Sequence, residues 1–138
     1  MNYCRTGSDK IEELWKLQKL YKSEIGEEAP DNACFERLKK AVEEGKILFF
    51  GAFDGEKLIG CCSVTLGFST FTYSSSGVFE DFYILPEYRH RGVARALVNC
   101  AYKESGVSSL TVGCADCDLE MYGSLGFSVK LGNLLAFE

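Results

Sequence analysis

The sequence has little proline, little histidine and no long apolar run. Its 138 residues include 2 prolines and 1 histidine. No apolar run approaches the roughly 20 residues of a membrane-spanning helix, so no membrane association is expected. Residues 1–14 lack the basic-then-apolar order of a signal peptide. We find no repeat, low-complexity tract or linker, and we therefore expect a single domain over residues 1–138.

Positive charge is also scarce relative to negative charge. The 20 acidic residues outnumber the 15 basic ones, for a net charge of −5. This disfavours nucleic-acid binding, which rests on clustered Lys and Arg, and mildly favours a cationic small substrate. Without a secretory signal, the 7 cysteines indicate reduced thiols and a cytoplasmic protein. Cys114 and Cys117 form a C-x-x-C with no second pair, so we expect no metal site.

Hydrophobic periodicity predicts helices and strands in a mixed α/β order. Helices are expected from Ser8 or Asp9 to residue 22, after Pro30 up to Gly45, and over residues 91–105 and 116–125. Strands are expected at residues 2–6, 46–53, 57–66, 78–85 and 108–112, with a terminal hairpin of 127–130 and 134–137. Residues 67–77 are interpreted as a strand end and a flexible serine-rich loop. This order predicts a mixed sheet with helices on both faces.

One turn carries most of the chemical information. After Pro86 the chain passes through Arg89-His90-Arg91-Gly92-Val93-Ala94 into a helix. The first N–H groups of a helix lack internal partners, and the helix dipole favours an anion there. The small residues admit a phosphate and the basic ones add positive charge, so the turn predicts a pyrophosphate site. The alternative is that the small residues only permit close helix–sheet packing and that the arginines are solvated.

The segment resembles the GCN5-related N-acetyltransferase (GNAT) superfamily. That family's acetyl-CoA motif, R/Q-x-x-G-x-G/A, matches residues 89–94, after a strand and before a helix. Downstream, residues 121–127 (MYGSLGF) resemble the family's Y-x-x-x-G-F signature. The resemblance implies a mixed, mostly antiparallel sheet with helices on both faces. It also implies a splayed parallel strand pair that forms a wedge for acetyl-CoA.

The resemblance implies a cofactor site at particular positions. The backbone of Phe82, Tyr83 and Ile84 would pair with the pantetheine arm and hold the acetyl carbonyl. The pyrophosphate would bind the amides from Arg91 to Arg95. The full set of implied cofactor-binding residues is Phe82, Tyr83, Ile84, Arg89, His90, Arg91, Gly92, Val93, Ala94 and Arg95.

Two side chains are candidates for proton transfer. Glu80 precedes the wedge, where similar polyamine-type members carry an acidic residue, and it would be the general base; a water chain is the alternative. Asp81 would lie on the opposite face of the strand, in a structural role. Tyr122 matches the family tyrosine that serves as general acid toward the coenzyme A thiolate. The competing interpretations are an exposed strand-end carboxylate for Glu80 and a half-buried aromatic for Tyr122.

The sequence therefore predicts acetyl transfer from acetyl-CoA to a small-molecule amine by direct attack. The alternatives are a non-catalytic acyl-CoA-sensing module and N-acetylation of a protein or peptide amine. The family often has an asparagine that contacts the cofactor where this chain has Ala115; either Asp116 or Asp118 replaces this contact, or the contact is missing. Members often dimerise through their C-terminal strands, so a homodimer stays open.

Overall fold

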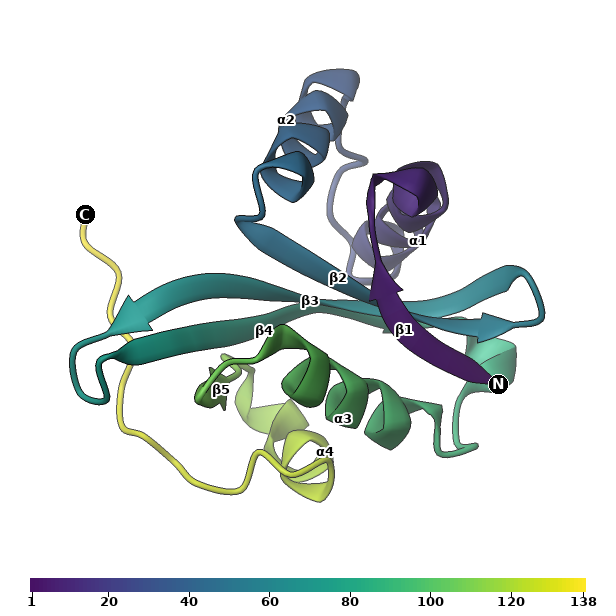
Figure 1. Cartoon of the computed structure of the whole chain (residues 1–138). Helices are drawn as coiled ribbons and strands as arrows, with labels where there is room; N and C mark the ends of the chain where they lie inside the picture. The colour runs from purple at the N-terminus through teal and green to yellow at the C-terminus, as the bar shows by residue number, and fades with distance from the viewer.

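Five strands form one twisted sheet in the order β1-β2-β3-β4-β5 (Figure 1). The computed structural model describes residues 1–138. The strands are β1 (Asn2–Thr6), β2 (Ile47–Asp54), β3 (Lys57–Ser69), β4 (Ser74–Ile84) and β5 (Ser109–Thr111). Neighbouring strands are antiparallel except for β4 and β5, which are parallel. The expected mixed, mostly antiparallel sheet is confirmed.

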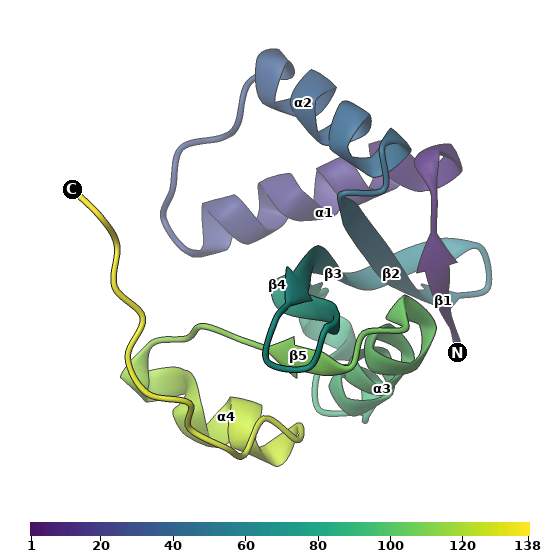
Figure 2. The same cartoon turned by 60° about the vertical axis from the view of Figure 1, so that its left-hand side comes forward.

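Helices cover both faces of this sheet (Figures 1 and 2). One layer holds α1 (Ile11–Glu24) and α2 (Asn32–Glu43), and the other holds α3 (Val93–Ser105) and α4 (Leu119–Ser124). Adjacent residues of β2 point into different layers: Phe49 packs in the cluster with Leu14 of α1, and Phe50 packs in the cluster with Leu97 of α3. Because both faces are covered, the strand is apolar almost throughout rather than alternating.

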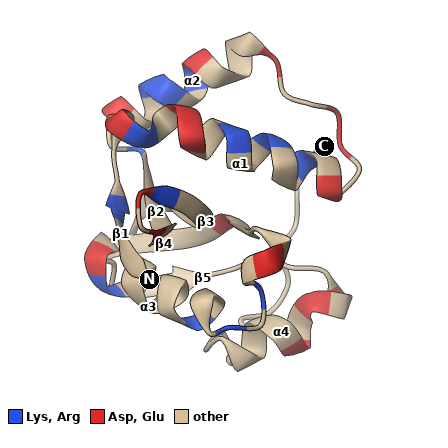
Figure 3. Ribbon diagram, turned by 90° about the vertical axis from the view of Figure 1, so that its right-hand side faces the viewer, with Lys and Arg blue, Asp and Glu red and all other residues tan.

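The helices α1 and α2 are amphipathic, and only α2 begins with a side-chain cap. Figure 3 shows charged residues of both signs along α1 and α2. The Asp31 side chain caps α2 and accepts a hydrogen bond from the Cys34 N–H at 2.9 Å. The expected cap of α1 at Ser8 or Asp9 is wrong. Those residues form a 3-10 turn with no side-chain cap, and α1 starts at Ile11.

The serine-rich segment expected to be a loop is mostly strand. β3 runs to Ser69 and β4 starts at Ser74, so only residues 70–73 form the turn. The serines make cross-strand hydrogen bonds: Ser74 Oγ lies 2.7 Å from Ser108 Oγ, and the Ser108 N–H donates to the Ser75 carbonyl at 2.9 Å. These bonds attach the hairpin to the start of β5 and account for strand structure in a composition typical of loops.

The terminal hairpin expected over residues 127–130 and 134–137 is absent. After α4 and Phe127 the chain runs as an extended tail without strand pairing (Figure 2). The apolar residues of the expected second strand, Leu134, Leu135 and Phe137, are exposed. In this structure β5 therefore forms the edge of the sheet. None of the helices is both long and apolar enough to cross a membrane.

Candidate active site

The central feature of the site is the point where β4 and β5 separate. The two strands pair only over Ser76–Val78 and Ser109–Thr111. From residue 79 onward, the edge of β4 that faces β5 has no strand partner. A cavity of about 210 Å³ opens there, lined by Tyr21 and Lys22 of α1, residues 79–82 of β4, residues 112–113 after β5, and Tyr122 of α4. The expected splayed pair of parallel strands is thus present.

A β-bulge changes the direction of the side chains beside this cavity. Ser63 is opposite Glu80 and Cys61 is opposite Tyr83, so Asp81 and Phe82 together face a single residue of β3. Asp81 is in the left-handed region, with φ of 54°, as the extra residue of a bulge can be. As a result Phe79 and Phe82 both pack against the α3-side cluster, with ring centroids 5.4 Å apart.

The same bulge corrects the expected position of Asp81. An unbroken strand would place Asp81 on the face opposite Glu80. Instead, Asp81 Oδ2 accepts a hydrogen bond of 2.6 Å from the hydroxyl of Ser63, the residue paired with Glu80. Both carboxylates therefore lie on the α1 side of the sheet. Glu80 is exposed and Asp81 is half-buried, and both line the cavity.

The turn before α3 leaves a row of backbone donors unused. His90 and Gly92 adopt left-handed φ values of 63° and 82°, which a glycine tolerates without strain. The first hydrogen bond of the helix runs from the Ala96 N–H to the Gly92 carbonyl. The N–H groups of residues 91–95 donate to no backbone carbonyl. This is the donor set that the sequence predicted for a phosphate, together with the positive end of the helix dipole.

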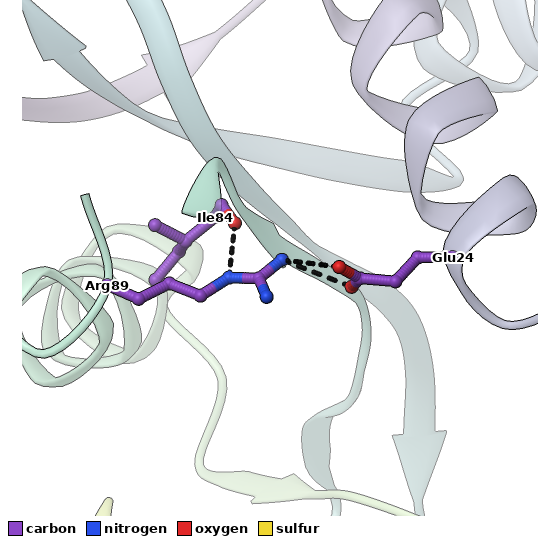
Figure 4. Close-up of polar contacts among 3 residues, drawn as sticks. All are labelled: Glu24, Ile84 and Arg89. Atoms are coloured by element: carbon purple, nitrogen blue, oxygen red, sulfur yellow. Dashed lines mark hydrogen bonds and ion pairs between the residues drawn. The ribbon is translucent and has the colours of Figure 1, made fainter. Parts of the chain in front are cut away.

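The arginine side chains around this turn make contacts within the protein. Arg89 donates from Nε to the Ile84 carbonyl at 2.8 Å and from a terminal nitrogen to both carboxylate oxygens of Glu24 at 3.0 and 3.1 Å (Figure 4). Arg95 donates to the Ser124 carbonyl. Arg91 lies over the Tyr88 ring, 5.6 Å from its centroid.

The side chains of Arg89 and Arg95 connect neighbouring elements of the protein, whereas the side chain of His90 does not. Arg89 joins the turn to the C-terminal end of α1, and Arg95 joins α3 to α4. The side chains of both arginines are therefore engaged within the protein. The Arg89 N–H also donates to the Pro86 carbonyl, whereas the Arg95 N–H has no backbone acceptor. The His90 side chain is exposed and makes no hydrogen bond within the protein.

Tyr122 lies on the cavity wall with its ring fixed by two aromatic neighbours. Its ring centroid is 5.9 Å from that of Phe127, edge to face, and 6.3 Å from that of Phe82. The hydroxyl makes no hydrogen bond within the protein. Burial, helped by nearby negative charge, raises the pKa of Tyr122 to about 12. The side chain is therefore a fully protonated donor at neutral pH.

Sequence reasoning missed Tyr21, which lines the same cavity from α1. Burial raises the pKa of Tyr21, and the charge of Asp81, which lines the same cavity, raises it further. The position of Tyr21 in the first predicted helix is compatible with a residue of the apolar face and does not distinguish it from a core residue. No local signal indicated that the end of this helix borders the separated strands.

The region that departs from the family pattern lies at the start of α4. Ala115 is exposed and precedes a 3-10 turn over Asp116–Asp118. Asp118 is half-buried and its charge contributes to the raised pKa of Tyr122, whereas Asp116 is exposed. Cys114 and Cys117 are free and exposed. No three His, Cys, Asp or Glu side chains gather into a group that could hold a metal ion.

Several solved structures with this fold are named as acetyltransferases. A possible acetyltransferase from Clostridium difficile 630 shares 16% identity with a TM-score of 0.85, covering 99% of this chain and 96% of that one. A predicted acetyltransferase from Clostridium acetobutylicum, solved with acetyl-CoA, shares 16% identity with a TM-score of 0.78. The match covers 99% of this chain and 95% of that one. An aminoglycoside acetyltransferase from an uncultured soil metagenomic sample, in complex with sisomicin, shares 16% identity with a TM-score of 0.80. The match covers 99% of this chain and 94% of that one. At these identities the likeness establishes the fold.

The family follows from the sequence itself. The model of the acetyltransferase (GNAT) domain matches residues 45–129, more than half of the chain. The chain belongs to this acetyltransferase family, as the motifs at residues 89–94 and 121–127 suggested. Among curated protein sequences, none matches this chain.

Proposed function

We propose that this protein transfers the acetyl group of acetyl-CoA to the amine of a small molecule by direct attack. The observation that carries the proposal is the separation of β4 from β5 after Val78 and Thr111, which opens a cavity beside an unpaired strand edge. Glu80 and Tyr122 line this cavity, so a base and an acid border one space. The acetyl-CoA-bound relative with the same fold supports the choice of donor.

In this proposal acetyl-CoA follows the unpaired edge of β4. Backbone groups of Phe82, Tyr83 and Ile84 hold the pantetheine arm and the acetyl carbonyl. A backbone N–H directed at that oxygen stabilises the charge that develops on it. The pyrophosphate binds the N–H groups from Arg91 through Gly92, Val93 and Ala94 to Arg95, which have no backbone acceptor. His90 lies beside them in the same turn.

The chain's own residues then manage the protons. A primary amine arrives protonated, and Glu80 takes one proton from it, so that the nitrogen lone pair can form a bond to the acetyl carbon. The carbon–sulfur bond breaks with its electron pair on sulfur, and Tyr122 gives that sulfur a proton. The new amide nitrogen loses its second proton to solvent, and solvent reprotonates Tyr122. Holding both substrates in one wedge supplies the rest of the rate enhancement.

The test is a thiol-release assay with acetyl-CoA and a panel of amines. The panel contains butylamine, 1,4-diaminobutane, an amino-acid amide and an aminoglycoside. We expect amine-dependent thiol release, reduced about 10²- to 10⁴-fold in Tyr122→Phe. Acetyl-CoA binding without turnover on any amine or on a lysine peptide would favour a sensing module. Turnover on the peptide alone would indicate a protein acceptor, and absence of acetyl-CoA binding would refute the proposal.

A further inference from the structure

We propose that Asp81 binds the ammonium group of the acceptor and that Ser63 positions Asp81 for this task. The inference rests on the proposed N-acetyltransferase function. It assigns a substrate-binding role to a residue whose expected place was the opposite face of the strand. The bulge at Asp81 is what turns this carboxylate toward α1, beside Glu80 and into the lining of the cavity.

The environment of Asp81 is arranged to fix one carboxylate oxygen and leave the other free. Ser63 is completely buried, and its hydroxyl donates to Oδ2 at 2.6 Å. Oδ1 accepts no hydrogen bond from the protein, and Asp81 makes no ion pair with any Lys, Arg or His. A carboxylate oxygen without a protein partner can accept a charge-assisted hydrogen bond from a bound ammonium group.

The charges around the cavity do not supply that cation. Lys22 is the only basic residue among the lining residues, and its ammonium pairs with Glu27 at 3.0 Å. The hydrogen bond to Glu27 is the main reason that the pKa of Lys22 is raised, with the charge of Asp81 as a lesser cause. Across the cavity stands the neutral phenol of Tyr21. Glu27 also lines the cavity, so the lining carries three carboxylates, of Glu27, Glu80 and Asp81, and one ammonium group. This excess of negative charge attracts a positively charged acceptor.

The two adjacent carboxylates suit different tasks. Glu80 is exposed and makes no hydrogen bond, so it can exchange its proton with solvent after each turnover. Asp81 is held by a buried hydroxyl on a neighbouring strand, so its free oxygen has a defined position. The free oxygen of Asp81 would accept one N–H of the ammonium group and so orient its nitrogen, while Glu80 removes another proton. Hydrogen bonds between charged groups, such as this one, are stronger than those between neutral groups.

The experiment compares Asp81→Asn with the matched control Glu80→Gln, each a carboxylate-to-amide change, and with Ser63→Ala. Steady-state kinetics use the panel amine that the wild-type protein acetylates best. Asp81→Asn should raise the KM for the amine at least tenfold, with a smaller change in kcat and an unchanged KM for acetyl-CoA. Ser63→Ala should raise the amine KM severalfold. Glu80→Gln should lower kcat and leave the amine KM within twofold.

Salt provides a second readout that a merely structural role would not move. The amine KM of the wild-type protein should rise between 0.05 and about 0.5 M ionic strength, and this dependence should flatten in Asp81→Asn. An Asp81→Asn variant that folds but keeps the amine KM within twofold of the wild type overturns the inference. So does a reversal of the roles of Asp81 and Glu80.

Two further outcomes are also decisive. If Asp81→Asn does not fold, Ser63→Ala decides, and an unchanged amine KM in that variant overturns the inference. If the wild-type protein turns over no amine, the proposed function fails by itself. Calorimetric titration of 1,4-diaminobutane into the acetyl-CoA complex then tests Asp81 directly: binding lost in Asp81→Asn supports the role, and absence of binding to the wild-type protein refutes it.

Discussion

Gly77 provides a quantitative test of how tightly the sheet is packed where β4 meets β5. Its backbone pairs with Leu66 on one side and Leu110 on the other. A Cβ at residue 77 would lie 2.5 Å from Cγ1 of Val64 and 3.2 Å from Cγ1 of Val107. Val64 is completely buried and, being β-branched, cannot rotate away easily. Alanine at position 77 therefore forces the core or the strand to move.

The magnitude follows from two opposing terms. Overpacking of this kind costs about 1–3 kcal/mol, and the smaller unfolded-state entropy of alanine returns about 0.4–1 kcal/mol. We expect Gly77→Ala to lower the free energy of unfolding by about 1–2 kcal/mol. With an unfolding entropy of about 2.1 cal/mol/K per residue, this corresponds to a Tm lower by about 3–7 °C.

The assay is thermal and urea denaturation of Gly77→Ala beside Gly67→Ala. Gly67 lies on the neighbouring rung of the same hairpin and is exposed, and a Cβ there meets only the rotatable Ser76 hydroxyl, at 3.3 Å. Gly67→Ala should match the wild-type protein or exceed it by up to about 0.5 kcal/mol. If Gly77→Ala is as stable as Gly67→Ala, the tight packing inferred at the base of the wedge is refuted.

Three further substitutions test other parts of the structure. Leu97→Ala removes a completely buried side chain and should cost about 2–5 kcal/mol in urea denaturation. Burial raises the pKa of Tyr122 from 10.0 to about 12, so the folded protein holds this proton more tightly than the unfolded chain. The stability of the wild type relative to Tyr122→Phe should therefore fall as pH rises from 10 toward 12. The Cys34 N–H lowers the pKa of Asp31 from 3.8, so Asp31→Ala should lower the Tm above pH 3.8, and this difference should vanish on further acidification.

The parts of the fold that depend on local chemistry were predictable from the sequence. Helix α2 follows from its apolar spacing after Pro30 and from Gly45 just beyond its end, whereas its Asp31 cap was found only in the structure. The turn at residues 89–94 follows from small and basic residues between a strand and a helix. In both cases the interactions that decide the structure lie within a few residues of one another. The membership of the chain in the GNAT family followed from the turn at residues 89–94 together with residues 121–127.

The parts that depend on distant partners were not predictable in the same way. The bulge at Asp81 is defined by its register against β3, 18 residues away from Ser63. The serine-rich strand ends are fixed by Ser108, more than 30 residues along the chain. The apolar segments at residues 127–130 and 134–137 look like a hairpin locally, but the two segments do not pair as strands. Hydrophobic periodicity indicates which face of a helix or strand is buried, but it does not identify the distant residues that pack or pair with that face.

The Arg89–Glu24 contact shows how the two halves of the site are held together. Arg89 belongs to the turn that carries the free N–H groups, and Glu24 ends the helix that brings Tyr21 and Lys22 to the cavity. The ion pair itself is partly exposed and contributes little stability. Its guanidinium also lies 5.3 Å from the ring centroid of Tyr83 and bonds to the Ile84 carbonyl. The motif arginine thus contacts both the end of β4 and the end of α1, and so lies between the proposed donor turn and the helix that lines the acceptor side.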